Sequence, residues 1–207
     1  MKTVLAGVCA GLLVVVAPSV ARASSIMFHV DITTSALVGN PSGPFSLDFQ
    51  LNDGGNGVTN TATIEHFTFG GGAAVGAATT TGSASGSLQA SINLSDVGGF
   101  FNDIYQEFTP GTSLGFDVTL SGNFADPADA FSVAILDGSL FNLATTLSGD
   151  TFVLVNISHA GLGFGDVQLG ESTDPRGVIA TAQPVPEPSS MVLVGAGLAL
   201  WLARRRK

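Results

Sequence analysis

The sequence predicts an all-β ectodomain, a single β-sandwich or jelly-roll-like fold, lying between two targeting segments. Four segments alternate strictly between apolar and polar residues, the period-two pattern of strands with one buried face: 26–32, 45–51, 88–94 and 114–120. Short groups of Gly, Asn, Asp and Pro separate these segments, as turns between strands require. Many short alternating strands joined by turns are typical of a β-sandwich.

Other segments complete the expected organisation of this domain. Further strands are expected at 61–69, 130–136 and 151–157, with additional candidates at 141–147 and 178–181. Residues 99–108 offer the only possible helical turn. The Gly- and Ala-rich stretch 70–86 is expected to be a flexible surface loop, because it has too little large apolar surface to offset its ordering entropy.

The last residues of the chain predict a transmembrane helix followed by a basic stop. Residues 189–203 carry no charge, and a helix of about 15 residues is roughly 22 Å long, against roughly 30 Å for the bilayer core. Such a short span requires local thinning of the bilayer or snorkelling of its flanking residues. A buried core helix, the alternative, would show a polar stripe that this run lacks. The inside-positive bias places the stop in the cytoplasm; it consists of Arg204, Arg205, Arg206 and Lys207.

Just before this span, Pro184, Pro186 and Pro188 alternate with other residues. Proline fixes φ and lacks the N–H group, so we expect this piece to be extended, solvated and free of sheet pairing. An extended peptide beside a membrane span suits a processing enzyme because its backbone is accessible. From the residues alone, a plain linker explains the pattern equally well.

The order Pro186-Glu187-Pro188, short apolar span and terminal arginine cluster resembles the PEP-CTERM sorting signal of exported bacterial proteins. The resemblance implies recognition by an exosortase, a membrane-embedded cysteine transpeptidase that cleaves near the Pro-Glu-Pro motif. It also implies a Gram-negative bacterium that makes extracellular polysaccharide or biofilm. The signal covers only about the last tenth of the chain. The ectodomain resembles an uncharacterised subgroup of PEP-CTERM proteins at 29–37, 47–50 and 101–108, and this second resemblance implies no function.

The N-terminal residues predict a signal peptide. Lys2 provides the positive n-region, and residues 3–16 form an apolar h-region. The small-x-small pattern of Ala21 and Ala23 places the cut before Ser24, with a second possible site at Ala21. The expected organisation is therefore a signal peptide at 1–23, an ectodomain at 24–183 and a sorting tail at 184–207.

The only cysteine, Cys9, would leave with the signal peptide. It lies too early for a lipoprotein cysteine, and Val8 stands where that modification needs a small residue. The mature chain is therefore expected to contain no cysteine, which excludes disulfides, thiolate catalysis and zinc–thiolate sites.

The ectodomain is strongly acidic. The whole chain has a formal net charge of −9, and every Lys and Arg except Arg176 lies in one of the two ends, whereas every Asp and Glu except Glu187 lies between them. Nucleic-acid binding requires Lys and Arg to displace counterions, so this class of function is excluded. Arg176 is expected to pair with Asp174 or Glu171 in a turn.

Two sets of residues are of the types that bind metals, but no metal site is predicted. Loop oxygens suggest calcium as an alternative cofactor, although Asp and Asn also make turns with their own backbone; the candidates are Asp53, Asn56, Asp126 and Asp129. His29, His66 and His159 lie far apart in the sequence and are expected to be ordinary surface residues rather than a metal triad.

The function predicted from these observations is that of an exported, non-enzymatic surface or extracellular-matrix protein. Standard hydrolase motifs are absent from the sequence. The alternative is a calcium- or glycan-binding β-sandwich module, and an extracellular hydrolase is the remote alternative. Glycan binding usually needs exposed aromatic side chains, whereas Tyr105 is the only tyrosine and the 14 Phe residues are expected mostly in the core.

Overall fold

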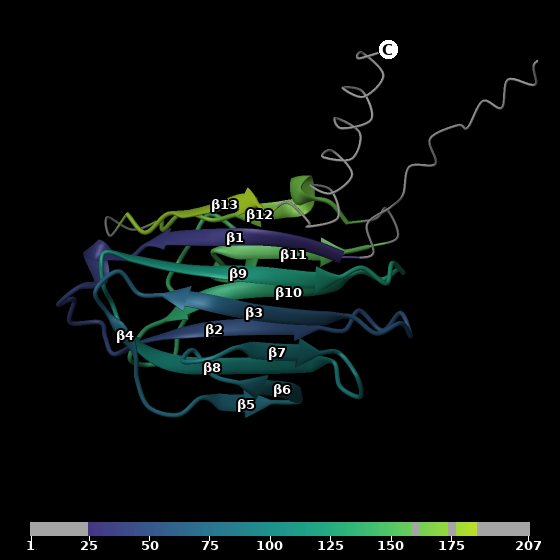
Figure 1. Ribbon diagram of the computed structural model, residues 1–207, viewed down its shortest axis with the longest axis horizontal. Coiled ribbons are helices and arrows are strands. Elements are labelled where there is room, and N and C mark those ends of the chain that lie inside the picture. Colours follow the sequence, from purple (N-terminus) through teal and green to yellow (C-terminus); the bar gives the residue numbers. More distant parts are fainter. Residues whose placement is uncertain (1–24, 159–161, 174–176, 186–207) are drawn as a thin grey trace, which may run out of the picture.

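The computed structural model describes residues 25–158, 162–173 and 177–185, which form two antiparallel β-sheets packed face to face (Figure 1). The strand order of the first sheet is β13 (Ala180–Pro184), β1 (Ser25–Thr33), β9 (Ser113–Ser121), β3 (Thr61–Thr68), β7 (Ile92–Ser95) and β6 (Ser83–Gly86). That of the second sheet is β12 (Val167–Leu169), β11 (Val153–Ile157), β10 (Asp129–Leu136), β2 (Phe45–Asn52), β8 (Phe101–Thr109) and β4 (Ala73–Ala74), with β5 (Thr79–Thr81) also paired to β8. Three short 3-10 helices lie at Ser35–Leu37, Ser148–Asp150 and Phe164–Asp166.

The core lies between the sheets and is built from the apolar faces of the alternating strands. Phe49 of the second sheet meets Phe116 of the first edge to face, with ring centroids 5.3 Å apart. Full burial of such a side chain contributes about 1.5–3 kcal/mol to the stability of the fold, so the contact between these rings helps to hold the two sheets together. The β-sandwich prediction is confirmed. Within the described ranges, no helix has the length and apolar character needed to cross a membrane.

Most of the predicted strands are confirmed, both among the strictly alternating segments and among the further candidates. Residues 26–32, 45–51, 61–69, 114–120 and 130–136 correspond to β1, β2, β3, β9 and β10. The strand expected at 151–157 begins at Val153, and the one expected at 88–94 is confined to β7. Leu88, although buried, lies in the turn before β7.

The helical turn considered for residues 99–108 is wrong, because this segment is β8, a nine-residue strand. Its core-facing positions include two amides, Asn102 and Gln106, which are 0% and 1% exposed. Their hydrogen-bonding groups are satisfied by neighbouring backbone; for example, the Leu88 N–H donates to Gln106 Oε1 at 2.8 Å. These inward polar residues interrupt the apolar alternation that marks the other strands.

The prediction of a flexible loop at 70–86 is also wrong, because this stretch forms β4, β5 and β6. Its small residues allow close backbone packing: a Cβ at Gly72 would collide with the Thr109 carbonyl oxygen. The buried Gln106 amide donates to the Gly76 carbonyl at 2.8 Å. Backbone pairing and this buried amide therefore order a segment that has few apolar side chains.

Three smaller expectations need correction. The candidate strand at 141–147 is a loop with isolated bridges at Asn142 and Thr145, and β12 was not predicted. The candidate at 178–181 is β13, which extends to Pro184. Pro184 therefore lies in a sheet, paired with Phe28, rather than in an unpaired peptide. Proline is tolerated there because β13 is an edge strand, where a missing N–H costs no ladder hydrogen bond.

Candidate binding face on the second sheet

The outward surface of the second sheet carries a continuous set of polar side chains. Since Leu47, Phe49 and Leu51 of β2 point into the core, the residues between them point outward. The β2–β8 register places Asp48 opposite Tyr105. We call this surface the outer face of the second sheet; its polar residues on β2 and β8 are Ser46, Asp48, Gln50, Asn52, Asp103, Tyr105 and Glu107.

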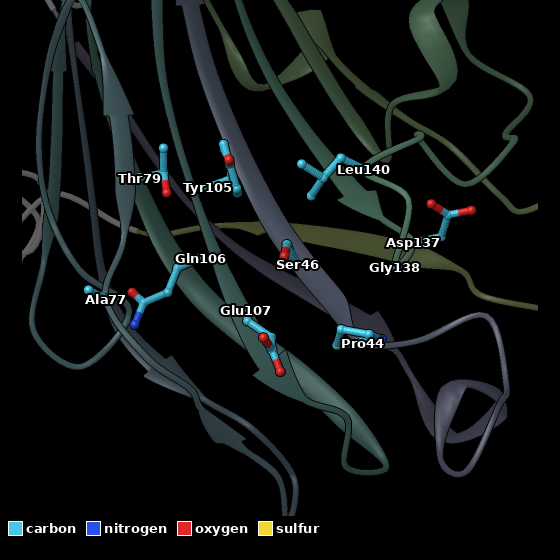
Figure 2. Close-up of a pocket in the computed structure, with 10 residues that line it drawn as sticks. All are labelled: Pro44, Ser46, Ala77, Thr79, Tyr105, Gln106, Glu107, Asp137, Gly138 and Leu140. Atoms are coloured by element: carbon cyan, nitrogen blue, oxygen red, sulfur yellow. The ribbon is translucent and has the colours of Figure 1, made fainter.

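The first of two hollows on this face has a volume of about 240 Å³ (Figure 2). Figure 2 shows its lining side chains arriving from β2, from β8, from the segment around β5 and from the turn after β10. Small residues such as Ser46 and Gly138 leave the space open, and Leu140 is 53% exposed at its edge. The lining consists of Pro44, Ser46, Ala77, Thr79, Tyr105, Gln106, Glu107, Asp137, Gly138 and Leu140.

The second hollow has a volume of about 340 Å³ and lies over β2, β10 and β11. The outward residues of β10, which are Ala130, Ser132 and Ala134, are small. They form the bottom of the hollow between the larger side chains of β2 and β11. Amides and hydroxyls dominate the wall supplied by β2, β11 and the loop after β10. The lining consists of Gln50, Asn52, Ala130, Ser132, Ala134, Asn142, Ser148, Gly149, Thr151, Leu154 and Asn156.

A buried acidic pair, Asp48 and Asp103, lies on the same face. Asp48 is 3% exposed and Asp103 is 7% exposed. Burial, together with a hydrogen bond and repulsion from Asp103, raises the pKa of Asp48 to about 8, although the Gln50 amide opposes this by donating to Asp48 Oδ2 at 2.7 Å. No N–H or O–H donor among the described residues reaches Asp48 Oδ1. The raised pKa favours the protonated form of Asp48 at neutral pH.

Both carboxyls of this pair are almost fully shielded from solvent. The β2–β8 register places Asp103 opposite Gln50, two residues along β2 from Asp48, so the two carboxyls are diagonal neighbours on the outer face.

The structure brings together three of the four calcium candidates, Asp53, Asn56 and Asp129, and their oxygens accept hydrogen bonds from N–H donors of the protein. Asp129 is fully buried, and its Oδ1 accepts hydrogen bonds from the Gly54 N–H at 2.7 Å and from Asn56 Nδ2 at 2.8 Å. Its Oδ2 accepts one from Asn60 Nδ2 at 2.7 Å. The Asp53 side chain accepts from the Gly55 N–H, a local turn contact. N–H donors thus occupy the oxygens that a cation would use.

Asp96, which the sequence did not suggest as a site residue, lies close to Asp53 and Asp129 and forms a cluster of carboxyls with them. Both of its carboxyl oxygens accept from the Asn60 N–H at 2.9 Å. Burial raises the pKa of Asp96 to about 6, with nearby Asp129 and Asp53 adding to the effect and the Asn60 hydrogen bond opposing it. Asp126, the fourth candidate, lies in the segment that precedes β10, three residues before Asp129. Among the described residues, no group of three His, Cys, Asp or Glu side chains is arranged to hold a metal ion.

Two of the three histidines meet on the outward surface of the first sheet. Asp117 of β9 bridges them, with Oδ1 2.6 Å from His29 Nδ1 and Oδ2 2.8 Å from His66 Nδ1. The hydrogen bond with Asp117 and the charge of Glu65 raise the pKa of His66. Partial burial would raise the pKa of Asp117, but its two histidine partners lower it. Both histidines are surface residues as predicted, yet they are not independent, because the β1–β9 register places His29 opposite Asp117.

Several predicted site residues lie outside the described residues. These are the signal-cleavage residues Ala21, Ala23 and Ser24, the motif Pro186, Glu187 and Pro188, the basic stop at 204–207, and the single residues His159 and Arg176.

Comparison with protein families decides the identity of the tail. A family model described as the PEP-CTERM protein-sorting motif matches residues 184–207. The chain carries a PEP-CTERM sorting signal. The PEP-CTERM signal implies an exported protein that is sorted at the membrane, with an exosortase as processing partner. The match is confined to the tail, and no curated protein and no solved structure matches the chain.

The PEP-CTERM signal begins inside the folded domain. Its first residue, Pro184, is the last residue of β13, and the Val185 N–H donates to the Met27 carbonyl at 3.1 Å. Pro186, the first residue of the Pro-Glu-Pro motif, follows directly in the sequence. In the sequence, the Pro-Glu-Pro motif therefore begins two residues after the last residue of the edge strand β13.

Proposed function

We propose that this protein is an exported, non-enzymatic surface or extracellular-matrix protein of a Gram-negative bacterium, delivered by its PEP-CTERM tail. A signal peptide at 1–23 starts export, and the apolar run 189–203 with its basic stop then holds the chain in the inner membrane. An exosortase cleaves near Pro186, Glu187 and Pro188 and releases the β-sandwich. The observation that carries this proposal is the PEP-CTERM match at residues 184–207.

The position of the two chain ends supports transient tethering. β1 starts at Ser25, directly after the proposed signal-peptide cut, and β13 ends at Pro184, directly before the proposed exosortase site. Because β1 and β13 are antiparallel neighbours, the start of one lies beside the end of the other, with Phe28 opposite Pro184. The described residues nearest the two processing points therefore lie at the same end of the first sheet, which suits a domain attached to one membrane at both steps.

Substitution of the motif tests this proposal. Glu187→Ala is expected to block processing and to leave full-length protein in the membrane fraction, as measured by immunoblotting of fractionated cells. Glu171→Ala provides a matched control, because it removes the same side chain from a position that precedes the tail. Normal processing of the Glu187→Ala protein would contradict the assigned motif.

A further inference from the structure

We propose that the outer face of the second sheet binds an uncharged polysaccharide, with the two hollows as neighbouring parts of one site. This inference deepens the proposed function by assigning a ligand class to the exported domain. It depends on the fold of the β-sandwich and not on how the tail is processed. Its test therefore has an outcome separate from that of Glu187→Ala.

The two hollows lie at successive positions along β2. Ser46 lines the first hollow, whereas Gln50 and Asn52 line the second, and Asp48 lies between them on the same outward side of the strand. The six-residue separation of Ser46 and Asn52 corresponds to about 20 Å along a strand. An extended chain of several sugar rings matches a shallow site of this length better than a compact small molecule does.

The lining chemistry matches hydroxyl groups. The lining amides of Gln50, Asn52, Asn142 and Asn156 can each donate and accept, and Ser132 and Thr151 add hydroxyls. Gln50, Asn142 and Thr151 each also donate one hydrogen bond within the protein, to Asp48, Gly149 and Ser148. Sites for small polar ligands combine a few such groups with apolar surface, and Tyr105 and Leu140 supply that surface in the first hollow.

Charge selects against other polymers. Every Lys and Arg of the chain lies outside the described residues, so the described outer face presents no such cation to an anionic polysaccharide. Asp137 and Glu107, which line the first hollow, would repel one. The Asp48–Asp103 pair holds a proton at neutral pH, which reduces the negative charge between the hollows. Because the face would repel an anionic polymer, the polysaccharide that fits its charge is an uncharged one, whose hydroxyl groups donate to the carboxylates and amide oxygens of the face.

Calorimetric titration of the purified full-length protein tests the proposal. The probes are maltohexaose, cellohexaose and mannohexaose as neutral chains, with a mannuronate hexamer as the anionic comparison. A zwitterionic detergent is required, because the sugar headgroup of a glycoside detergent would compete for the site. We expect at least one neutral hexamer to bind and the mannuronate hexamer not to bind.

Matched variants locate the site. Tyr105→Ala removes the aromatic surface of the first hollow and is expected to weaken binding about tenfold, whereas Tyr105→Phe retains the ring and most of the affinity. Asn156→Ala removes an exposed strand amide from the second hollow and is expected to weaken binding severalfold. Asn93→Ala, an equivalent change on β7 of the first sheet, is the control and should leave binding unchanged.

Three results would overturn the proposal. The first is the absence of binding to every neutral hexamer by a protein whose circular dichroism shows it to be folded. The second is tighter binding of the mannuronate hexamer than of the neutral chains. The third is concentration-dependent dimerisation that Tyr105→Ala abolishes, since this would identify the outer face as a contact between copies of the chain.

Discussion

The carboxyls of Asp48 and Asp103 interact across β2 and β8, and the resulting pair keeps a proton at neutral pH. The pKa of Asp48, about 8, lies far above its ordinary value of 3.8 because burial and the neighbouring carboxyl both disfavour the charged form. Between these two pH values the folded protein binds a proton that the unfolded chain does not. Its stability therefore falls as pH rises from about 4 to about 8.

Asp48→Asn is expected to remove this pH dependence. The amide retains an acceptor for Gln50 and donates to Asp103 without titrating. We expect the variant to be more stable than the parent at pH 8 by about 1 kcal/mol or more, and to differ little near pH 4. Urea unfolding at several pH values measures the effect. Glu107→Gln, an exposed carboxyl on the same strand face, serves as the control. Identical pH profiles for Asp48→Asn and the parent would show that Asp48 holds no proton at neutral pH.

The buried Gln106 amide is expected to hold the segment 73–89 in place. Gln106→Leu keeps the approximate volume but leaves the Leu88 N–H and the Gly76 carbonyl without partners, which costs about 1–3 kcal/mol for each buried group that stays unsatisfied. Gln89→Leu alters an exposed partner of the same amide and should change stability by less than about 0.5 kcal/mol. Hydrogen exchange with mass spectrometry is expected to show faster exchange of β4, β5 and β6 in Gln106→Leu. Equally fast exchange of these strands in the parent would support the flexible loop that the composition suggested.

The buried Asp129 is expected to act through its amide partners rather than through calcium. Asp129→Asn places an NH2 group against the N–H donors of Gly54, Asn56 or Asn60, and we expect a loss of about 1–3 kcal/mol. Melting of the parent protein should give the same midpoint with millimolar calcium as with a chelator. A rise in midpoint with calcium that Asp129→Asn abolishes would restore these residues as ligands.

The sequence predicts those parts of the fold that apolar side chains determine. Strict alternation identifies β1, β2 and β9, because their core-facing residues are large and apolar. It fails at β8, where Asn102 and Gln106 face inward, and in 70–86, where backbone pairing and a buried amide replace apolar contacts.

The candidate site depends on strand order, which the sequence does not provide. Alternation places Asp48 on the outward face of its strand, but Asp103 lies in β8, which the sequence does not predict, and only the pairing of β2 with β8 brings the two residues together. Similarly, only the β1–β9 register places His29 beside Asp117. The tail differs, because its three parts are contiguous in sequence, and it was identified correctly without any knowledge of the fold.

Mass-spectrometric mapping of the C-terminal peptide, on protein isolated from its native host, tests the central claim of tail-directed sorting most directly. The proposal predicts a terminus near Pro188 and no peptide from the apolar run 189–203. An intact terminus at Lys207 in the membrane fraction would contradict it, because the chain would then be a permanently anchored domain rather than a cleaved exosortase substrate.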